Sequence, residues 1–182
     1  MKEILFATGN ERKIGEARLA CQDFGITVKQ IKLVIDEIQS HDPIEISQHK
    51  ANEAFKQAKS GVVITDTSWS IPALNGFPGG YMKDVAEWFT PEDFITLIAS
   101  KKDRRISFTE TIIYQDDTRT KTFSKEYFGE IVTTPRGNGE SIEQVAEFDG
   151  FTLGEQHDKG RFSHDPKDYI WYQFAQWYAQ GN

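Results

Sequence analysis

Hydrophobic positions in the N-terminal part of the chain follow a pattern of alternating strands and helices. Residues 4–6 form a short apolar run, and from Lys13 onward apolar residues recur at helical spacing. A second extended segment covers residues 26–35, and a second helix covers about residues 47–59. The uninterrupted apolar run 62–64 is typical of a parallel strand that is covered on both faces. This order of elements predicts an α/β protein with a parallel sheet.

The pattern changes after the third predicted strand. Residues 72–80 are rich in proline, glycine and asparagine, which indicates a loop. A helix is predicted over residues 82–88, and another begins at Pro91, because proline suits the first helical turn. The segments 106–114 and 121–132, separated by a polar turn, predict a long antiparallel hairpin.

The C-terminal segment predicts a helix. Asp165 suits the N-cap position and Pro166 the first helical position. Residues 137–159 are rich in glycine and glutamate, and their apolar residues show no regular spacing from which a helix or strand could be predicted. The apolar stripe of the C-terminal helix consists of Ile170, Phe174, Trp177 and Tyr178.

Composition narrows the class of protein. The chain has 182 residues, a formal net charge of −7 and 38% hydrophobic residues, which predicts one compact domain over residues 1–182. The acidic balance argues against a protein that coats nucleic acid, but it allows a small anionic ligand held by a few focused cations. No apolar run is long enough for a transmembrane helix, the first residues become polar too soon for a signal peptide, and the single Cys21 allows no internal disulfide. We therefore expect a cytoplasmic protein that does not bind membranes.

The segment that joins the first strand to the first helix is a candidate phosphate site. Free N–H groups and the positive end of the dipole at a helix N-terminus favour an anion, and Arg12 and Lys13 add positive charge. The segment is not a P-loop, because the glycine spacing and the Lys-Ser/Thr pair are missing. The alternative is an ordinary turn in which Asn10 is the N-cap of the helix and both cations are solvated.

Two carboxylates are candidates for a metal site. Asp66 follows the third apolar strand, so we expect it at the carboxyl end of a parallel strand, where α/β proteins place ligands. Glu45 lies at the start of the second helix, and two carboxylates over a phosphate site would suit Mg²⁺. The alternative is that Asp66 caps a turn with Thr67 and Ser68, and that Glu45 only favours a helix N-terminus.

The sequence offers weaker evidence of a functional role for the histidines and the cysteine. His164 could bind a phosphate or titrate near neutral pH, or it could be a surface histidine before a helix cap. Cys21 falls on the apolar face of the first helix, which predicts a core residue rather than a thiol nucleophile. No zinc site is expected, because metal-ligand spacing is missing around His41, His49 and His157.

Four stretches of the sequence resemble the inosine triphosphate pyrophosphatase family, whose members hydrolyse non-canonical purine nucleoside triphosphates to the monophosphate and pyrophosphate. They occur in the family's order and at about its spacing, from residue 4 to about residue 137. The resemblance implies an elongated α/β domain with a central mixed sheet flanked by helices, two lobes with the substrate cleft between them, and a homodimer. The matching stretches are FATGNERKIGEARL, PIEISQHKANEAF, VVITDTSWSIPALNGFPGGYMK and GEIVTTPRG.

The resemblance also implies roles for individual residues. Glu45 and Asp66 would act around Mg²⁺ or Mn²⁺, and Asp66 would orient or deprotonate the attacking water with Lys13 as its catalytic partner. This agrees with the chemistry, because hydrolysis between two phosphates needs charge neutralisation and a placed water. The substrate-binding residues implied by the match are Thr8, Asn10, Lys13, Lys50, Lys159 and His164.

The sequence departs from the family pattern where the family reads the base. The stretch GNGESIEQVAEF replaces the family's aromatic GFG[YW]DP motif, with Glu143 where the aspartate would be. Asp165 stands where the family has an arginine, and Thr65 where Glu or Asp is usual. Three aromatic residues could stack on a base or belong to the core instead, namely Trp69, Phe148 and Phe151.

These observations predict a metal-dependent nucleoside triphosphate pyrophosphatase with altered base recognition. One alternative is a nucleotide-binding or regulatory homologue without catalysis, and another is a pyrophosphatase for a different nucleotide class, such as pyrimidine or modified nucleotides. The acidic and basic residues that were kept favour an active enzyme, namely Lys13, Glu45, Asp66 and Lys159.

Overall fold

The computed structural model describes residues 2–159, 167 and 169–181 and divides into two compact units. The first unit comprises Met1–Thr67, Glu110–Lys125 and His164–Asn182, and the second comprises Ser68–Thr109 and Glu126–Ser163. The division falls within the long strands β3 (Val62–Ile71), β5 (Arg105–Gln115) and β6 (Thr120–Ile131), so each of these strands contributes residues to both units. The mixed α/β class with helices around a central sheet is as predicted.

The first unit is built on parallel strands. Strand β1 (Lys2–Ala7) lies between β2 (Ile26–Ile31) and β3 and pairs with both in parallel. Strand β2 ends earlier than predicted, although Leu33 and Ile35 beyond it still pack against buried residues. The alternating apolar residues of the sequence therefore extend beyond the last hydrogen-bonded residue of β2, because Leu33 and Ile35 also take part in packing.

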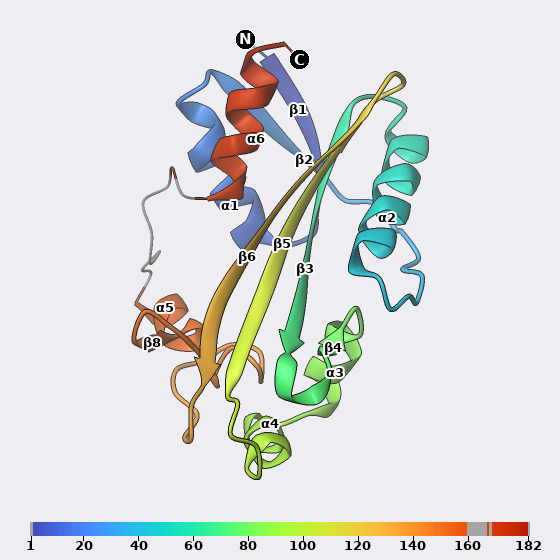
Figure 1. Ribbon diagram of the computed structural model, residues 1–182. Coiled ribbons are helices and arrows are strands. Elements are labelled where there is room, and N and C mark those ends of the chain that lie inside the picture. Colours follow the sequence, from blue (N-terminus) through green and yellow to red (C-terminus); the bar gives the residue numbers. More distant parts are fainter. Residues whose placement is uncertain (1, 160–166, 168, 182) are drawn as a thin grey trace. The chain divides into compact units, whose positions relative to one another are not determined.

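Helices cover both faces of these strands (Figure 1), with α1 (Glu11–Gln22) and α6 (Ile170–Ala179) on one side and α2 (Pro43–Ala58) on the other. Successive residues of a strand point to opposite faces, so Phe6 and Val63 pack with α1 and α6, while Val62 and Ile64 pack with α2. Each fully buried large side chain of this kind stabilises the fold by roughly 1.5–3 kcal/mol. The apolar run that predicted a doubly covered parallel strand is explained by this arrangement.

Side-chain caps determine where the first two helices begin. The Asn10 side chain accepts hydrogen bonds from the backbone N–H groups of Arg12 and Lys13, so α1 starts at Glu11. Helix α2 starts four residues before the predicted Ser47, because Asp42 is its N-cap and Pro43 occupies its first position. Glu45 consequently lies in the first turn of α2, as predicted.

Strand β3 is much longer than the apolar run that predicted it. It spans Val62–Ile71, so the expectation that the strand ends before Asp66 is wrong. Its parallel pairing joins Leu5 of β1 with Val62 and Phe6 with Val63, and β1 itself ends at Ala7. Asp66 is thus an interior residue of β3 that lies beyond the carboxyl end of the neighbouring strand.

The hairpin of β5 and β6 agrees with the predicted boundaries. At its turn, the Asp116 carboxylate accepts hydrogen bonds from the Tyr114 hydroxyl at 2.8 Å and from both the backbone and the hydroxyl of Thr118 at 2.8 and 2.7 Å. The Arg119 guanidinium ion-pairs with Asp116 and lies over the rings of Tyr114 and Trp177, the latter on α6. The turn is therefore joined to the C-terminal helix through an aromatic and charged cluster.

The second unit has its own apolar core. Helix α3 spans Met82–Trp88 as predicted, α4 spans Pro91–Ile98 with a capping box at Thr90, and the short strand β4 (Phe77–Gly79) pairs with β3. Buried side chains of these elements and of the adjoining strands form one cluster that includes Trp69, Phe94, Ile98, Ile106, Val145 and Phe148.

Three elements lie in the stretch for which no clean period was found. They are β7 (Ala146–Phe148), β8 (Phe151–Thr152) and α5 (Leu153–Asp158), all too short to give a periodic pattern. Strands β6, β7 and β8 are neighbours, and each adjacent pair is antiparallel. This region is held in place by polar contacts of side chains with backbone carbonyls and carboxylates.

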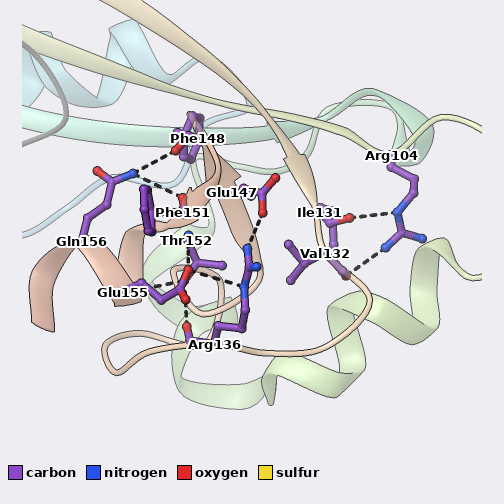
Figure 2. A network of polar contacts seen from close by, with 10 residues as sticks. All are labelled: Arg104, Ile131, Val132, Arg136, Glu147, Phe148, Phe151, Thr152, Glu155 and Gln156. Carbon is purple, nitrogen blue, oxygen red and sulfur yellow. Dashed lines mark hydrogen bonds and ion pairs between the residues drawn. The ribbon is translucent and has the colours of Figure 1, made fainter. Parts of the chain in front are cut away.

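Figure 2 shows these polar contacts. Arg104 donates to the carbonyl groups of Ile131 and Val132, both at 2.8 Å, where β6 ends. Arg136 ion-pairs with Glu147 and with Glu155, the latter at 3.4 Å.

The Thr152 hydroxyl donates to the Arg136 carbonyl at 2.8 Å, and Gln156 donates to the carbonyls of Phe148 and Phe151. The backbones of the two segments also approach closely, since a Cβ at Gly137 would lie 2.2 Å from backbone atoms of Gly154 and Glu155. Only glycine fits there.

The C-terminal helix carries the predicted apolar stripe. Helix α6 begins at Ile170, and Phe174 is fully buried while Trp177 and Tyr178 pack at the edge of the core. The predicted start at Asp165 and Pro166 lies outside the described residues. Within the part of the chain that the structure covers, no helix has the length and apolar character needed to span a membrane.

The hairpin turn makes stability depend on pH. Although desolvation raises the pKa of Asp116, hydrogen bonds from Thr118, Tyr114 and Arg119 outweigh it and hold this pKa well below its usual range. The stabilisation is present above the unfolded-state pKa of about 3.9 and is lost as the pH falls toward the folded-state value. We expect Asp116→Asn to lower the free energy of unfolding by about 2 kcal/mol at pH 7, and by less at pH 3.

Thermal unfolding at both pH values measures this difference. For a chain of this size we expect Asp116→Asn to lower the unfolding midpoint Tm by roughly 4–8 °C at pH 7. Asp117→Asn is the matched control, because Asp117 is an exposed residue of the same turn. Equal effects of Asp116→Asn at both pH values would contradict the assignment.

Candidate functional site

The candidate site lies in the first unit, at the N-terminus of α1. The Thr8 hydroxyl accepts a hydrogen bond from the Asn10 backbone at 3.1 Å, and the Asn10 side chain caps the helix. The predicted alternative for Asn10, an N-cap, is therefore correct as a statement of local structure. Since Asn10 satisfies the N–H groups of Arg12 and Lys13, the side chain of Lys13 is the candidate group for binding an anion at this helix end.

Lys13 reaches from α1 to β3. Its Nζ lies 3.4 Å from the Thr67 hydroxyl, and the side chain is half-buried. Burial lowers the pKa of Lys13, while the nearby carboxylates of Asp66 and Glu110 raise it and the cations Lys50 and Arg12 lower it. The ammonium group is thus desolvated and lies within the field of several charges.

Asp66 is approached from the other face of the sheet. The Ser47 hydroxyl of α2 donates to Asp66 Oδ2 at 3.4 Å, and the Thr67 backbone N–H donates to Oδ1 at 3.0 Å. Lys50, also from α2, lies 4.0 Å from Asp66 Oδ1 and 2.9 Å from Glu37 Oε1. The structure thus brings Lys50 and Asp66, two of the predicted site residues, close together.

The second predicted metal ligand has a separate environment. Glu45 is exposed, and its carboxylate accepts a hydrogen bond from the Ser40 hydroxyl at 2.6 Å. Among the residues whose placement is described, no group of three or more His, Cys, Asp or Glu side chains could hold a metal ion. Mg²⁺ usually takes several of its ligands from water and from substrate phosphates, with one or two carboxylates from the protein.

The other predicted residues lie elsewhere in the chain. Lys159 belongs to the second unit, follows α5 and is exposed, with its Nζ 4.2 Å from the centre of the Phe151 ring. His164 and Asp165 lie outside the described residues. Cys21 is fully buried, as predicted, and burial raises its pKa to about 12, so it is not a reactive thiol.

The segment that replaces the family's aromatic motif is built into the core. In residues 137–148 the one aromatic side chain is the buried Phe148, and Ile142, Val145 and Ala146 are fully buried. Glu143 Oε2 lies 3.5 Å from His157 Nδ1 and accepts a hydrogen bond from the Glu140 backbone. Glu143 therefore organises its own loop.

Two of the three aromatic residues considered for base stacking are core residues. Trp69 and Phe148 are only 5% and 6% exposed. Phe151 is half-buried and carries Lys159 over its face. Of the candidates, Phe151 alone keeps a partly accessible ring within the described residues.

Sequence reasoning missed several residues of the site. Glu37 lies in a segment without regular structure, Ser47 was taken as the first residue of α2, and Glu110 lies on a predicted strand. Glu110 is the one charged residue of the predicted strand 106–114, and that was the available signal for it. Thr67 was considered only as part of a turn, because β3 was expected to end before it.

The sequence of this chain matches a known protein family and several known proteins. The model of the Ham1 family matches residues 4–164. A dITP/XTP pyrophosphatase of Methanopyrus kandleri is 31% identical over 182 residues, covering 97% of this chain and 96% of that protein. A Trypanosoma cruzi protein named inosine triphosphate pyrophosphatase 2 is 32% identical over 170 residues, covering 91% of this chain and 86% of its own.

A solved structure has the same fold. The HAM1 protein from Coxiella burnetii superposes with a TM-score of 0.82 at 22% sequence identity, and the match covers 99% of this chain and 100% of that one. At this identity the structural likeness supports the fold alone.

The geometry predicts that Lys13 contributes to binding of a polyphosphate anion. We expect Lys13→Ala to weaken binding of inorganic triphosphate roughly ten- to a hundredfold, as for loss of one charge-assisted contact. Isothermal titration calorimetry measures this change. Lys56→Ala is the matched control, because Lys56 is exposed on α2 and ion-paired with Glu53. Equal affinity of the Lys13 and Lys56 variants would contradict the assignment.

Proposed function

Because this chain belongs to the Ham1 family, we propose that it hydrolyses non-canonical nucleoside triphosphates to the monophosphate and pyrophosphate. The family match covers most of the chain, and relatives that are matched along nearly their whole length are named as dITP/XTP and inosine triphosphate pyrophosphatases. The observation that carries the proposal is the convergence of Lys13, Lys50 and Asp66 on one stretch of β3.

Each residue of this group has a role in the proposed reaction. Lys13 and Lys50 would bind the negatively charged phosphates, and Thr8 and Asn10 would shape the helix end that receives them. Asp66 would accept a hydrogen bond from the attacking water, orient it, and take its proton as the phosphoric anhydride bond breaks. Lys50 beside Asp66 would hold a phosphate close to this carboxylate.

The carboxylates of Asp66 and Glu45 have the chemistry that a divalent cation held jointly with substrate requires. We assign Asp66 and Glu45 as the ligands of Mg²⁺, with Mn²⁺ as a substitute, because carboxylate oxygens and phosphate oxygens are the ligands these ions prefer. When bound, the cation would neutralise charge on the phosphates. The chain's own contribution is to place the carboxylates and lysines around the phosphates.

Base selection is the part of the proposal in which this chain differs from the family pattern. In the segment 137–148 the one aromatic ring, that of Phe148, is buried in the core, so recognition of the base by this segment would use polar or backbone groups. Lys159 and His164 stay assigned to substrate binding by their motif match. An assay over many nucleotides therefore has to include pyrimidine and modified bases.

Two further features belong to the same proposal. We assign a homodimer from the family resemblance, and light scattering in solution measures it. The cytoplasmic location expected from the sequence would place the enzyme with its nucleotide substrates.

The test of the function is release of pyrophosphate from a panel of canonical and damaged nucleoside triphosphates with Mg²⁺. We expect hydrolysis of one or a few of them, and a decrease in kcat of at least about a hundredfold in Asp66→Asn, since the attacking water loses its base. Asp117→Asn, which changes an exposed carboxylate of the hairpin turn, is the matched control.

Two results would count against the proposal. An undiminished Asp66→Asn variant would remove Asp66 from the mechanism. No release across the whole panel from a folded protein that still binds triphosphate would indicate a nucleotide-binding homologue without catalysis.

A further inference from the structure

One face of the first unit's sheet carries a group of polar residues around Lys13. Side chains alternate along β3, so Thr65 and Thr67 lie on the same face as Val63, which packs with α1. On β5 the same rule places Glu110 on the face of Ile112 and Tyr114, which belong to that cluster too. Lys13 comes from α1 to this face and contacts Thr67.

The strand pairing brings Glu110 beside this part of β3. Strands β3 and β5 are neighbours, a Cβ at Gly61 would lie 2.8 Å from the Tyr114 hydroxyl, and the rings of Trp69 and Phe108 are 5.2 Å apart. The two strands therefore run in opposite directions, and residue 110 comes next to the stretch that holds Thr65 and Thr67.

The hairpin register gives Glu110 a second charged neighbour. The Thr111 and Ser124 hydroxyls are 3.4 Å apart, and the Ile131 backbone donates to the Arg104 carbonyl at 2.8 Å. This register puts Lys125 directly opposite Glu110, a spacing at which side chains of opposite charge interact. The half-buried carboxylate of Glu110 thus lies between cations of two elements, Lys125 on β6 and Lys13 on α1.

Two observations connect this group to a ligand site rather than to folding alone. The Thr65 hydroxyl is buried and has no hydrogen-bond partner among the residues that the structure describes. Lys13 is desolvated, and the charged groups that act on its pKa are Asp66, Lys50, Glu110 and Arg12. A desolvated ammonium group tends to lose its proton, and the carboxylate of Asp66 and, to a smaller extent, that of Glu110 oppose this loss.

We propose that Glu110 is a positioning residue for Lys13, whose ammonium group it directs toward the bound phosphates. This inference rests on the proposed function, in which Lys13 binds those phosphates. Glu110 touches no substrate in this role, and it acts only through Lys13. The carboxylate comes from the strand next to β3, while β3 itself has an uncharged threonine at position 65.

The test compares Glu110→Gln with Glu126→Gln. Glu126 is a matched control, because it lies on the same hairpin and on the opposite face, where it accepts a hydrogen bond from Ser107 at 2.7 Å. We expect the Kd for inorganic triphosphate and the KM for the best nucleotide substrate to rise about tenfold or more in Glu110→Gln, with a smaller change in kcat. The control should stay within about twofold of wild type, and calorimetric unfolding checks that both variants fold.

A second pair of variants keeps the test decisive if Glu110→Gln does not fold. Glu110→Asp and Glu110→Asn have side chains of the same size and differ in charge, so the proposal expects Asp to bind inorganic triphosphate several-fold more tightly than Asn. Equal affinities in this pair, or an unchanged Kd and KM in a folded Glu110→Gln, would overturn it. A wild-type protein that binds inorganic triphosphate but hydrolyses no nucleotide would contradict the proposed function instead, and the Kd comparison would still decide the role of Glu110.

Discussion

Burial of both faces of the parallel strands is the constraint on which the first unit depends. Since β1 and β3 place alternate side chains against α1 and α6 on one face and against α2 on the other, both layers must form for either strand to be covered. The same packing fixes the direction from which each helix approaches β3. The polar residues of the candidate site lie where this apolar layering stops, beyond the end of β1.

The two lysines of the site approach β3 from opposite faces for this reason. Lys13 comes with α1 and contacts Thr67, while Lys50 comes with α2 and lies near Asp66, the preceding residue of the strand. The consecutive residues Asp66 and Thr67 of β3 therefore face side chains from two different helices, α2 and α1. The strand alternation that builds the core also separates Thr67, which contacts Lys13, from the Asp66 carboxylate, which lies near Lys50, within the length of two residues.

Partial burial strengthens the electrostatic interactions between these charged groups, because less water screens them. In the half-buried environment of Lys13 the attraction of Asp66 and Glu110 is less screened than it would be at the surface, and it opposes the loss of charge that desolvation favours. In the second unit, charge has a structural use. There Arg104 donates to backbone carbonyls at the end of β6, and Arg136 ion-pairs with carboxylates of the short elements β7 and α5, as Figure 2 shows.

The sequence alone determined the elements that carry a recognisable run or spacing of apolar residues. The strands around residues 4–6 and 62–64, helix α3, the hairpin and the apolar stripe of α6 follow from spacing, and the buried state of Cys21 follows from its place on a helix face. Motifs of the sequence also placed Lys13, Lys50 and Asp66 among the residues of one family. Short elements such as β7, β8 and α5 escaped because they are held by contacts with distant residues.

Only the tertiary structure decided how far β3 extends, which face each polar residue occupies and which residues surround Lys13. Asp66 was expected after a strand and lies inside one, because hydrogen bonding continues along β3 after the apolar run has ended. Glu110 is far from Lys13 in sequence, and strand order and register alone bring the two together. A sequence records spacing along the chain, whereas the charge around a buried lysine depends on neighbours that meet only when the sheet is formed.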